Sequence, residues 1–517
     1  MSIQKGIDMK LNIKPIFGAM VHEYAFEGPC RFGVGEQLSA EYDRMAAGIA
    51  FKKFKEELEA QLSGSEFRLL EPLYGERDEQ FIVHADDIEK MRADDLEADC
   101  YLVASVGRTY DQILALAEKT RKPILSVQFC CNNTIVSAML RARGFEAYTF
   151  PTWEETVRQL RILRVRKVFQ KSNVMLVTRG NSVMAPISAS DGFLSLEEVT
   201  RRLGVHFRYL DLHEYLDQAT GNDPDGNYTL PTRRGLNLTA DEREEVSRRA
   251  DELIANAEEC TVKKQYIENS LRAYMLSKKA MEHMECNAMT IPCPEACATT
   301  RLNKEQFTFC LNHALLCEEG IPSACEYDIP GLLAMIALSN FSASAPYLGN
   351  TISVPLKEDN RTLYHNFIWM PKLGEAVAEI EDEEARRNLI LTLHSVPNRK
   401  MRGFNEPGAP YRIHPFTGSG WGPTLRHDFR LDAGQIITMA RFSPAADALF
   451  VARGVVRSSV GEDLNGCTSG VVFSVKDRHD FHEKQVSFGN HIPLVYGDCL
   501  EEMVEFGRQL GLKVVTA

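Results

Sequence analysis

The chain has 517 residues, of which 44% are apolar and 25% are charged, the composition of a globular protein with more than one domain. Its 59 basic and 72 acidic residues give a net charge of −13. This balance predicts neither a nucleic-acid partner nor a membrane partner, because both kinds of surface attract basic proteins.

Charged residues interrupt the amino-terminal segment at Lys5, Asp8, Lys10 and Lys14, so no continuous hydrophobic signal region is expected there. The 13 cysteines have no regular spacing. In a long chain this disfavours a disulfide framework and favours a reducing compartment. The sequence therefore predicts a cytoplasmic protein.

Strands and helices alternate through the first third of the chain. The pattern predicts strands over residues 13–21, 99–106, 123–128 and 146–150, and helices over 38–62, 109–120 and 133–143. Strands that alternate with helices form a parallel sheet with helices on both faces. We therefore expect an amino-terminal doubly wound α/β domain over residues 1–170.

The same alternation begins again after a basic helical stretch near residues 153–167. We expect strands over 173–178 and 205–210, helices over 194–203 and 240–284, and an irregular loop over 219–238. The uncharged stretch from Ile329 to Leu356 is broken by serines, Asn340 and Pro346, so it predicts a buried helix and a loop rather than a membrane span. These features predict a second α/β domain over residues 171–356.

The pattern changes near residue 357 to short apolar runs separated by turn residues. These runs cover residues 391–394, 435–442, 449–456, 471–475 and 491–495, followed by a helix over 499–510 and a strand over 512–516. They are typical of an antiparallel sheet or barrel. The predicted fold class is therefore α/β: two doubly wound α/β domains followed by a β-rich, barrel-like C-terminal domain over residues 357–517.

Two carboxylates, Glu326 and Asp328, stand where a strand-like run gives way to the apolar helix. This corresponds to the carboxyl edge of a sheet, where open α/β folds bind ligands. Asp328 fits the N-cap of that helix and Pro330 fits its first turn. Glu326 has no comparable structural role, which makes it the stronger candidate for chemistry.

Two further segments carry polar residues beside strand-like runs. Asn350 follows the apolar helix at the expected edge of a strand, and His491 leads from a glycine turn into the run 491–495. A lone histidine in that position is more often structural than catalytic, and spacing alone does not select it.

Taken together, the segments around Glu326, Asn350 and His491 resemble the L-fucose/L-arabinose isomerase superfamily, the metal-dependent aldose–ketose isomerases. The resemblance runs from Cys-Glu326-Tyr-Asp through the helix 331–341 to Asn350, where fucose isomerases carry an aspartate, and to Asn-His491. It implies that Glu326, Asn350 and His491 hold Mn²⁺ or another divalent cation. It also implies a monosaccharide or modified monosaccharide substrate and a homo-oligomer, a trimer or a hexamer.

Under this resemblance Glu326 both binds the metal and moves a proton between two sugar carbons through an ene-diolate. Asn350 offers a carbonyl oxygen to a cation but cannot accept a proton. One alternative is an isomerase in which Asp328, water or another group supplies the second proton transfer. The other is different sugar chemistry, or a sugar-binding or regulatory protein with altered or lost catalysis.

The main candidates for substrate binding are His394, Trp421 and Arg31. His394, with His414 and His427 as weaker candidates, can hydrogen-bond sugar hydroxyls if the β-rich domain closes over the site. Trp421, in a glycine-rich turn, can stack on a pyranose. The resemblance implies that Arg31, in the amino-terminal domain, reaches a neighbouring subunit's site and binds a substrate anion or oxygen there. Each also fits a plain surface or turn role.

The pair Cys293 and Cys297 superficially resembles a metal motif. Zinc sites usually need four ligands, and no second Cys/His pair follows at a familiar distance. Structural cysteines are therefore favoured at these positions.

Overall fold

The computed structural model describes residues 2–23, 37, 39–77, 83–106, 109–127, 131–178, 192, 194–219, 238–359, 361–363 and 370–517. Arg31, predicted to bind substrate, lies outside these residues. The chain divides into two compact units, Asp8–Lys167 and Met1–Ile7 with Val168–Ala517. The predicted segments 171–356 and 357–517 both fall in the second unit.

A parallel sheet forms the centre of the unit Asp8–Lys167. Its described strands follow the order β2-β1-β4-β5-β6, with β3 beside the far half of β1. Every pairing in it is parallel. The strands are β1 (Leu11–Met20), β2 (Phe67–Leu69), β3 (Leu73–Arg77), β4 (Cys100–Val106), β5 (Ile124–Ser126) and β6 (Ala147–Thr149).

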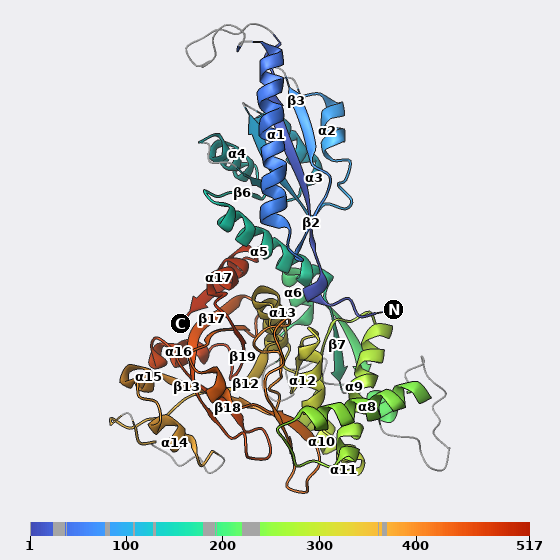
Figure 1. Ribbon diagram of the computed structural model, residues 1–517, viewed down its shortest axis with the longest axis vertical. Helices are drawn as coiled ribbons and strands as arrows, with labels where there is room; N and C mark the ends of the chain where they lie inside the picture. The colour runs from blue at the N-terminus through green and yellow to red at the C-terminus, as the bar shows by residue number, and fades with distance from the viewer. Residues whose placement is uncertain are drawn as a thin grey trace. The chain divides into compact units, whose positions relative to one another are not determined.

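Helices cover both faces of this sheet (Figure 1). They are α1 (Ala40–Leu62), α2 (Ala85–Met91), α3 (Tyr110–Thr120), α4 (Cys131–Ala142) and α5 (Trp153–Lys171). Phe17 of β1 packs against Phe51 and Phe54 of α1, with ring centroids 5.6 and 5.8 Å apart. The next residue back, Ile16, belongs to the cluster on the opposite face. β1 is therefore buried along most of its length, and the expected doubly wound architecture is confirmed.

The larger unit contains a second parallel sheet with the order β11-β10-β7-β8. Its strands are β7 (Asn173–Thr178), β8 (His206–Asp211), β10 (Ala288–Thr290) and β11 (Ser323–Ala324). The helices in this stretch are α6 (Leu196–Leu203), α7 (Leu212–Ala219), α8 (Ala240–Asn256), α9 (Lys264–His283), α10 (Cys293–Ala298), α11 (Arg301–Glu305) and α12 (Cys310–Glu318). Residues of α7, α8, α9 and α12 pack together in one core cluster with Met175 and Val177 of β7.

An antiparallel barrel completes the larger unit. The described strands run in the order β16-β19-β12-β13-β18-β17, and pairing of β16 with β17 closes the ring. Their bounds are β12 (Tyr347–Ser353), β13 (Leu389–His394), β16 (Ile436–Phe442), β17 (Ala448–Val460), β18 (Ser469–Ser474) and β19 (His491–Tyr496), and β20 (Lys513–Thr516) adds to β17 in parallel. Figure 1 shows these strands in yellow to red. The expected barrel-like β-rich region is confirmed.

Smaller elements surround the barrel and the second sheet. A three-stranded sheet joins β9 (Glu259–Cys260) with the hairpin of β14 (Arg412–Pro415) and β15 (Pro423–Arg426). The remaining described helices are α14 (Leu373–Ala378), α15 (Glu383–Arg387), α16 (Arg478–Gln485) and α17 (Leu500–Gln509), with short 3₁₀ helices at Gly6–Asp8 and Phe429–Asp432.

The apolar helix α13 (Ile329–Ser342) packs against β10 and β11 of the parallel sheet and against β16 and β19 of the barrel. It is buried from Ile329 to Phe341, which explains why it is apolar on every side rather than on one face. None of the helices in the described part of the chain combines the length and the apolar character needed to cross a bilayer.

β12 begins earlier than the sequence indicated. The predicted strand edge at Asn350 lies inside the strand, which starts at Tyr347. Gly349 resembles a turn residue in the sequence, but its role is close packing: a Cβ atom there would lie 2.8 Å from the carbonyl oxygen of Leu393 on the neighbouring strand. Position 349 therefore requires glycine because two strands lie close together there, although in the sequence this glycine resembles a loop residue.

Phe17→Ala should destabilise the unit Asp8–Lys167 by about 3 to 5 kcal/mol, because it leaves a cavity between β1 and α1. Hydrogen–deuterium exchange of the full chain, read on the peptides of β1 and β4, measures this loss. Ile49→Ala is the matched control, since the Ile49 side chain on α1 is 66% exposed and should change stability by less than about 0.5 kcal/mol. Equal protection in both variants would contradict the packing described.

Candidate active site

Glu326 lies in a tight turn between β11 and α13. Both Glu326 and Tyr327 have φ of 61°, in the left-handed region. Two consecutive residues with side chains rarely adopt this conformation, and such strain is concentrated at functional sites. The turn directs the Glu326 side chain toward the ends of barrel strands β13 and β19, where it meets two histidines.

The Glu326 carboxylate lies between these two buried imidazoles. Its Oε1 is 3.5 Å from Nε2 of His394, and its Oε2 is 3.5 Å from Nε2 of His491. The two histidine rings are 5.5 Å apart, edge to face. Neither Nε2 atom, nor Nδ1 of His491, has a hydrogen-bond partner among the described residues. Buried polar atoms without hydrogen-bond partners indicate that the site accommodates an additional group.

Asp328 caps α13 and also orients His491. Its Oδ1 accepts a hydrogen bond from the backbone N–H of Gly331 at 2.8 Å. Its Oδ2 accepts one from Nη1 of Arg441 at 2.7 Å and lies 3.3 Å from Nδ1 of His491. Arg441 also donates to the backbone carbonyls of His491 and Phe488. The ring of His491 is therefore held with Nε2 directed at Glu326.

His394 is held differently. Its Nδ1 accepts a hydrogen bond from the backbone N–H of Ser395 at 2.9 Å, so a neutral His394 carries its proton on Nε2. Burial lowers the pKa of His394 below its ordinary value, despite the opposing effect of Glu326. A neutral His394 can therefore donate a hydrogen bond through Nε2–H, and it also lies in a group with Cys325 and Glu326 whose ligand atoms are all within 4.8 Å of one another.

Burial and charge compete at the other three ionisable groups. Burial alone raises the pKa of Glu326, but His394 and His491 lower it more, so its pKa lies below the ordinary value. Burial also raises the pKa of Asp328, and Arg441 and then His491 reverse the shift. Burial lowers the pKa of His491, but the carboxylates of Asp328 and Glu326 raise it by more, so the pKa of His491 lies above its ordinary value. Both carboxylates are therefore ionised, which makes the site favourable for a cation.

Asn350 lies beside these groups on the barrel wall. It pairs directly with His491 of β19 and with Leu393 of β13, one residue before His394. The register places the backbone of Asn350 next to that of His491, whereas strand alternation puts the Asn350 side chain on the face of Leu393 and not on that of His394. The Asn350 carbonyl oxygen accepts a hydrogen bond from Nδ2 of Asn490 at 2.6 Å.

The donor set fits a divalent cation. Glu326 supplies carboxylate oxygens, and His491 supplies an imidazole nitrogen that a neighbouring carboxylate orients, as is usual for metal-binding histidines. The amide oxygen of Asn350 belongs to the set only by the sequence resemblance, since among the described residues its recorded side-chain contact is with Asn490. Oxygen-rich sets with one imidazole suit Mn²⁺ and similar ions.

The other residues weighed as sugar contacts lie in separate surroundings. Trp421 is half-buried in the turn that joins β14 and β15, where its backbone bonds to Thr417. His414 contacts Glu259, and His427 contacts Asp432. Among the described residues, no recorded contact joins any of these three to Glu326.

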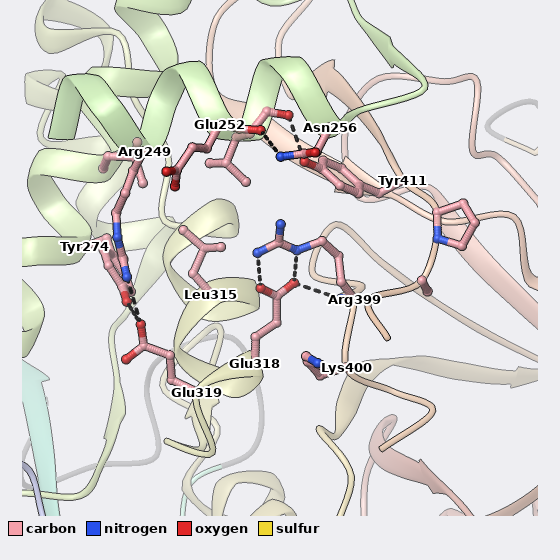
Figure 2. A pocket seen from close by; sticks show the side chains of 15 residues that line it. Arg249, Glu252, Asn256, Tyr274, Leu315, Glu318, Glu319, Arg399, Lys400 and Tyr411 are labelled. Carbon is pink, nitrogen blue, oxygen red and sulfur yellow. Dashed lines mark hydrogen bonds and ion pairs between the residues drawn. The ribbon is translucent and has the colours of Figure 1, made fainter. Parts of the chain in front are cut away.

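A large cavity of about 810 Å³ lies elsewhere in the larger unit, lined by α8, α9, α12 and the loop after β13 (Figure 2). Figure 2 shows Arg399 facing Glu318, with two hydrogen bonds of 2.9 and 2.6 Å. Arg249 is paired with Glu319 at 3.4 Å. Since these cations are already neutralised by carboxylates, the cavity offers less for chemistry than the site at Glu326.

No family model matches the chain. The chain is similar to proteins named sulfoquinovose isomerase. Those of Priestia aryabhattai and Priestia megaterium are each 24% identical over 365 residues, which cover 70% of this chain and 68% of the relative. That of Alkalicoccus urumqiensis is 30% identical over 210 residues, 40% of each protein. These similarities bear out the prediction that the chain is an enzyme of the isomerase class.

Sequence reasoning missed Arg441, which is fully buried and holds both Asp328 and the His491 backbone. A signal was present, because Arg441 is the only charged residue in the apolar run 435–442. A buried arginine needs a carboxylate or several oxygen acceptors as partners, but the sequence does not say which ones.

Arg441→Met should destabilise the larger unit by about 3 to 5 kcal/mol, because it leaves the Asp328 carboxylate buried without its cation. The double variant Arg441→Met with Asp328→Asn should recover much of this loss, since asparagine removes the charge and still accepts the bond from Gly331. Urea unfolding of the four proteins in this cycle measures the coupling. Additive effects of the two substitutions would show that the pair is not coupled.

Proposed function

We propose that the chain is a metal-dependent aldose–ketose isomerase that acts on a monosaccharide or modified monosaccharide. The observation that carries the proposal is the Glu326 carboxylate between two buried histidine nitrogens that lack hydrogen bonds within the described residues. The similarity to sulfoquinovose isomerases supports it. The resemblance of the Glu326, Asn350 and His491 segments to the fucose isomerases supports the same chemistry.

Glu326, His491 and Asn350 would hold the divalent cation. When bound, the cation supplies positive charge beside the sugar oxygens and stabilises the negative charge that develops on them. Glu326 is ionised and partly exposed, with a side chain 23% accessible, so it can take a proton from one sugar carbon and return it to the next. His394 donates its Nε2–H to a sugar oxygen, and Asp328 keeps His491 in position.

Asp328 is better suited to positioning than to proton transfer. It is 1% exposed, and its two oxygens already serve Gly331, Arg441 and His491. Of the alternatives left open by the sequence, a second proton transfer through water or another group therefore has more support than one through Asp328. A proton shuttle needs access to the substrate, which a fully buried carboxylate lacks.

Asn350 supports a second candidate function, that of a sugar-binding or regulatory protein without efficient catalysis. An amide in place of the aspartate of the fucose isomerases removes one negative charge from the proposed metal set. The two functions differ in one observable, because only an isomerase exchanges the proton on the sugar carbon with solvent.

Glu326→Gln should lower kcat at least about 100-fold, because glutamine keeps the shape of the side chain but cannot carry the proton. The assay supplies Mn²⁺ and an aldose panel that includes sulfoquinovose, and follows ketose formation and deuterium uptake by NMR in D₂O. Glu381→Gln, an exposed change, is the matched control. Full turnover in Glu326→Gln would reject the assignment, and sugar binding by the unaltered protein without exchange would favour the binding function.

Asn350→Asp should tighten Mn²⁺ binding about tenfold, because it adds a negative charge to the proposed donor set and still accepts the bond from Asn490. Titration calorimetry of the metal-free protein measures the affinity. Asn303→Asp, an exposed change on α11, adds the same charge away from the site and should leave the affinity unchanged. Unchanged or weaker binding in Asn350→Asp would exclude Asn350 from the metal set.

A further inference from the structure

Two cysteines and a histidine from three separate elements converge next to the candidate active site. Cys293 begins α10, Cys325 follows β11, and His313 lies in α12. The Cys293 sulfur is 3.3 Å from the Cys325 sulfur and 3.7 Å from Nε2 of His313. The three ligand atoms all lie within 4.8 Å of one another.

The histidine of this thiol cluster (Cys293, His313 and Cys325) is already oriented. His313 is 1% exposed, and its Nδ1 lies 2.8 Å from the hydroxyl oxygen of Ser323. This hydrogen bond leaves Nε2 to face the sulfurs. A partner on the second ring nitrogen is the usual support of a metal-binding histidine.

We propose that Cys293, His313 and Cys325 form a binding site for Zn²⁺, with a water molecule or other small donor in the fourth position. Thiolate and imidazole ligands favour zinc, whereas carboxylate and amide oxygens favour harder ions. The thiol cluster and the donor set at Glu326 therefore select different metals. The zinc site does not depend on the proposed isomerase activity.

The spacing of the sulfurs favours a bridging ion over a direct sulfur–sulfur bond. Two zinc–sulfur bonds of ~2.3 Å in a tetrahedron place the sulfurs about 3.8 Å apart, which is about half an ångström wider than the 3.3 Å between Cys293 and Cys325. A disulfide requires ~2.0 Å, a larger displacement. It would also give no role to Nε2 of His313.

The zinc site would fix the residue that precedes Glu326. Cys325 also lies within 4.8 Å of ligand atoms of Glu326 and His394, so the two sites are adjacent along the strained turn. Zinc bound to Cys325 would restrict the backbone that positions the Glu326 carboxylate. This adjacency means that the experiment must separate the two metals by the chemistry of their ligands.

Cobalt titration of the reduced, metal-free full chain makes this separation. Co²⁺ bound to thiolates gives an intense sulfur-to-metal charge-transfer band in the near ultraviolet, which oxygen and nitrogen ligands do not give. We expect one equivalent of this band per chain, and its loss when Zn²⁺ is added. No band in the reduced protein would overturn the proposal.

Variants assign the band to particular residues. Cys293→Ser should abolish it, whereas Cys297→Ser, a change within the same helix, should retain it. Ser323→Ala should weaken Zn²⁺ binding about 10- to 100-fold by releasing His313. Circular dichroism of each variant checks folding. A band that persists in Cys293→Ser would place the thiolate ligands elsewhere and reject the site.

Glu326→Gln distinguishes failure of this proposal from failure of the proposed function. It should retain the charge-transfer band while losing isomerisation. Loss of the band in Glu326→Gln would show that the thiol cluster is not an independent site, whatever the fate of the sugar chemistry.

Discussion

The buried ion pair between Asp328 and Arg441 holds together the parts of the larger unit on which the candidate site depends. Neither side chain is more than 2% exposed, and their charged atoms are 2.7 Å apart. Two charges removed from water are tolerated only as a well-bonded pair, so the start of α13 and strand β16 are fixed to each other. Because Glu326 is two residues before Asp328 and Arg441 also binds the carbonyl of His491, this pair brings the carboxylate and the imidazole together.

The pair in turn requires open space at Gly331. A Cβ atom at that position would lie 2.6 Å from Oδ2 of Asp328 and 3.1 Å from Nη1 of Arg441. The first turn of α13 therefore combines a proline, a capping aspartate and a glycine, each with a separate physical reason. The backbone strain at Glu326 and Tyr327 is compatible with this arrangement because the helix start and the barrel hold both sides of the turn.

Periodicity was sufficient to predict the long elements of the fold. The strand 173–178 matches β7, the helix expected from Ile329 begins there as α13, and the run 435–442 contains β16. Short strands such as β10 and β11 have too few residues to show a detectable periodicity. They are recognised in the structure by their pairing with neighbouring strands. The start of β12 was also missed, because Gly349 is selected by the closeness of the neighbouring strand and not by a turn.

The candidate site was predictable in part for the same kind of reason. Local cues identified Glu326 and the cap at Asp328, and resemblance alone identified His491. Arg441 and the convergence of Cys293 with His313 and Cys325 depend on pairings between elements far apart in the sequence, which a local pattern does not encode. This convergence also affects the chemistry of the site, because one peptide bond joins Cys325, a soft thiol donor, to Glu326, a hard carboxylate donor. Under the two proposals, an ion held by the first would constrain the geometry of the second, so the selectivity of each donor set would decide whether the turn keeps the shape that isomerisation needs.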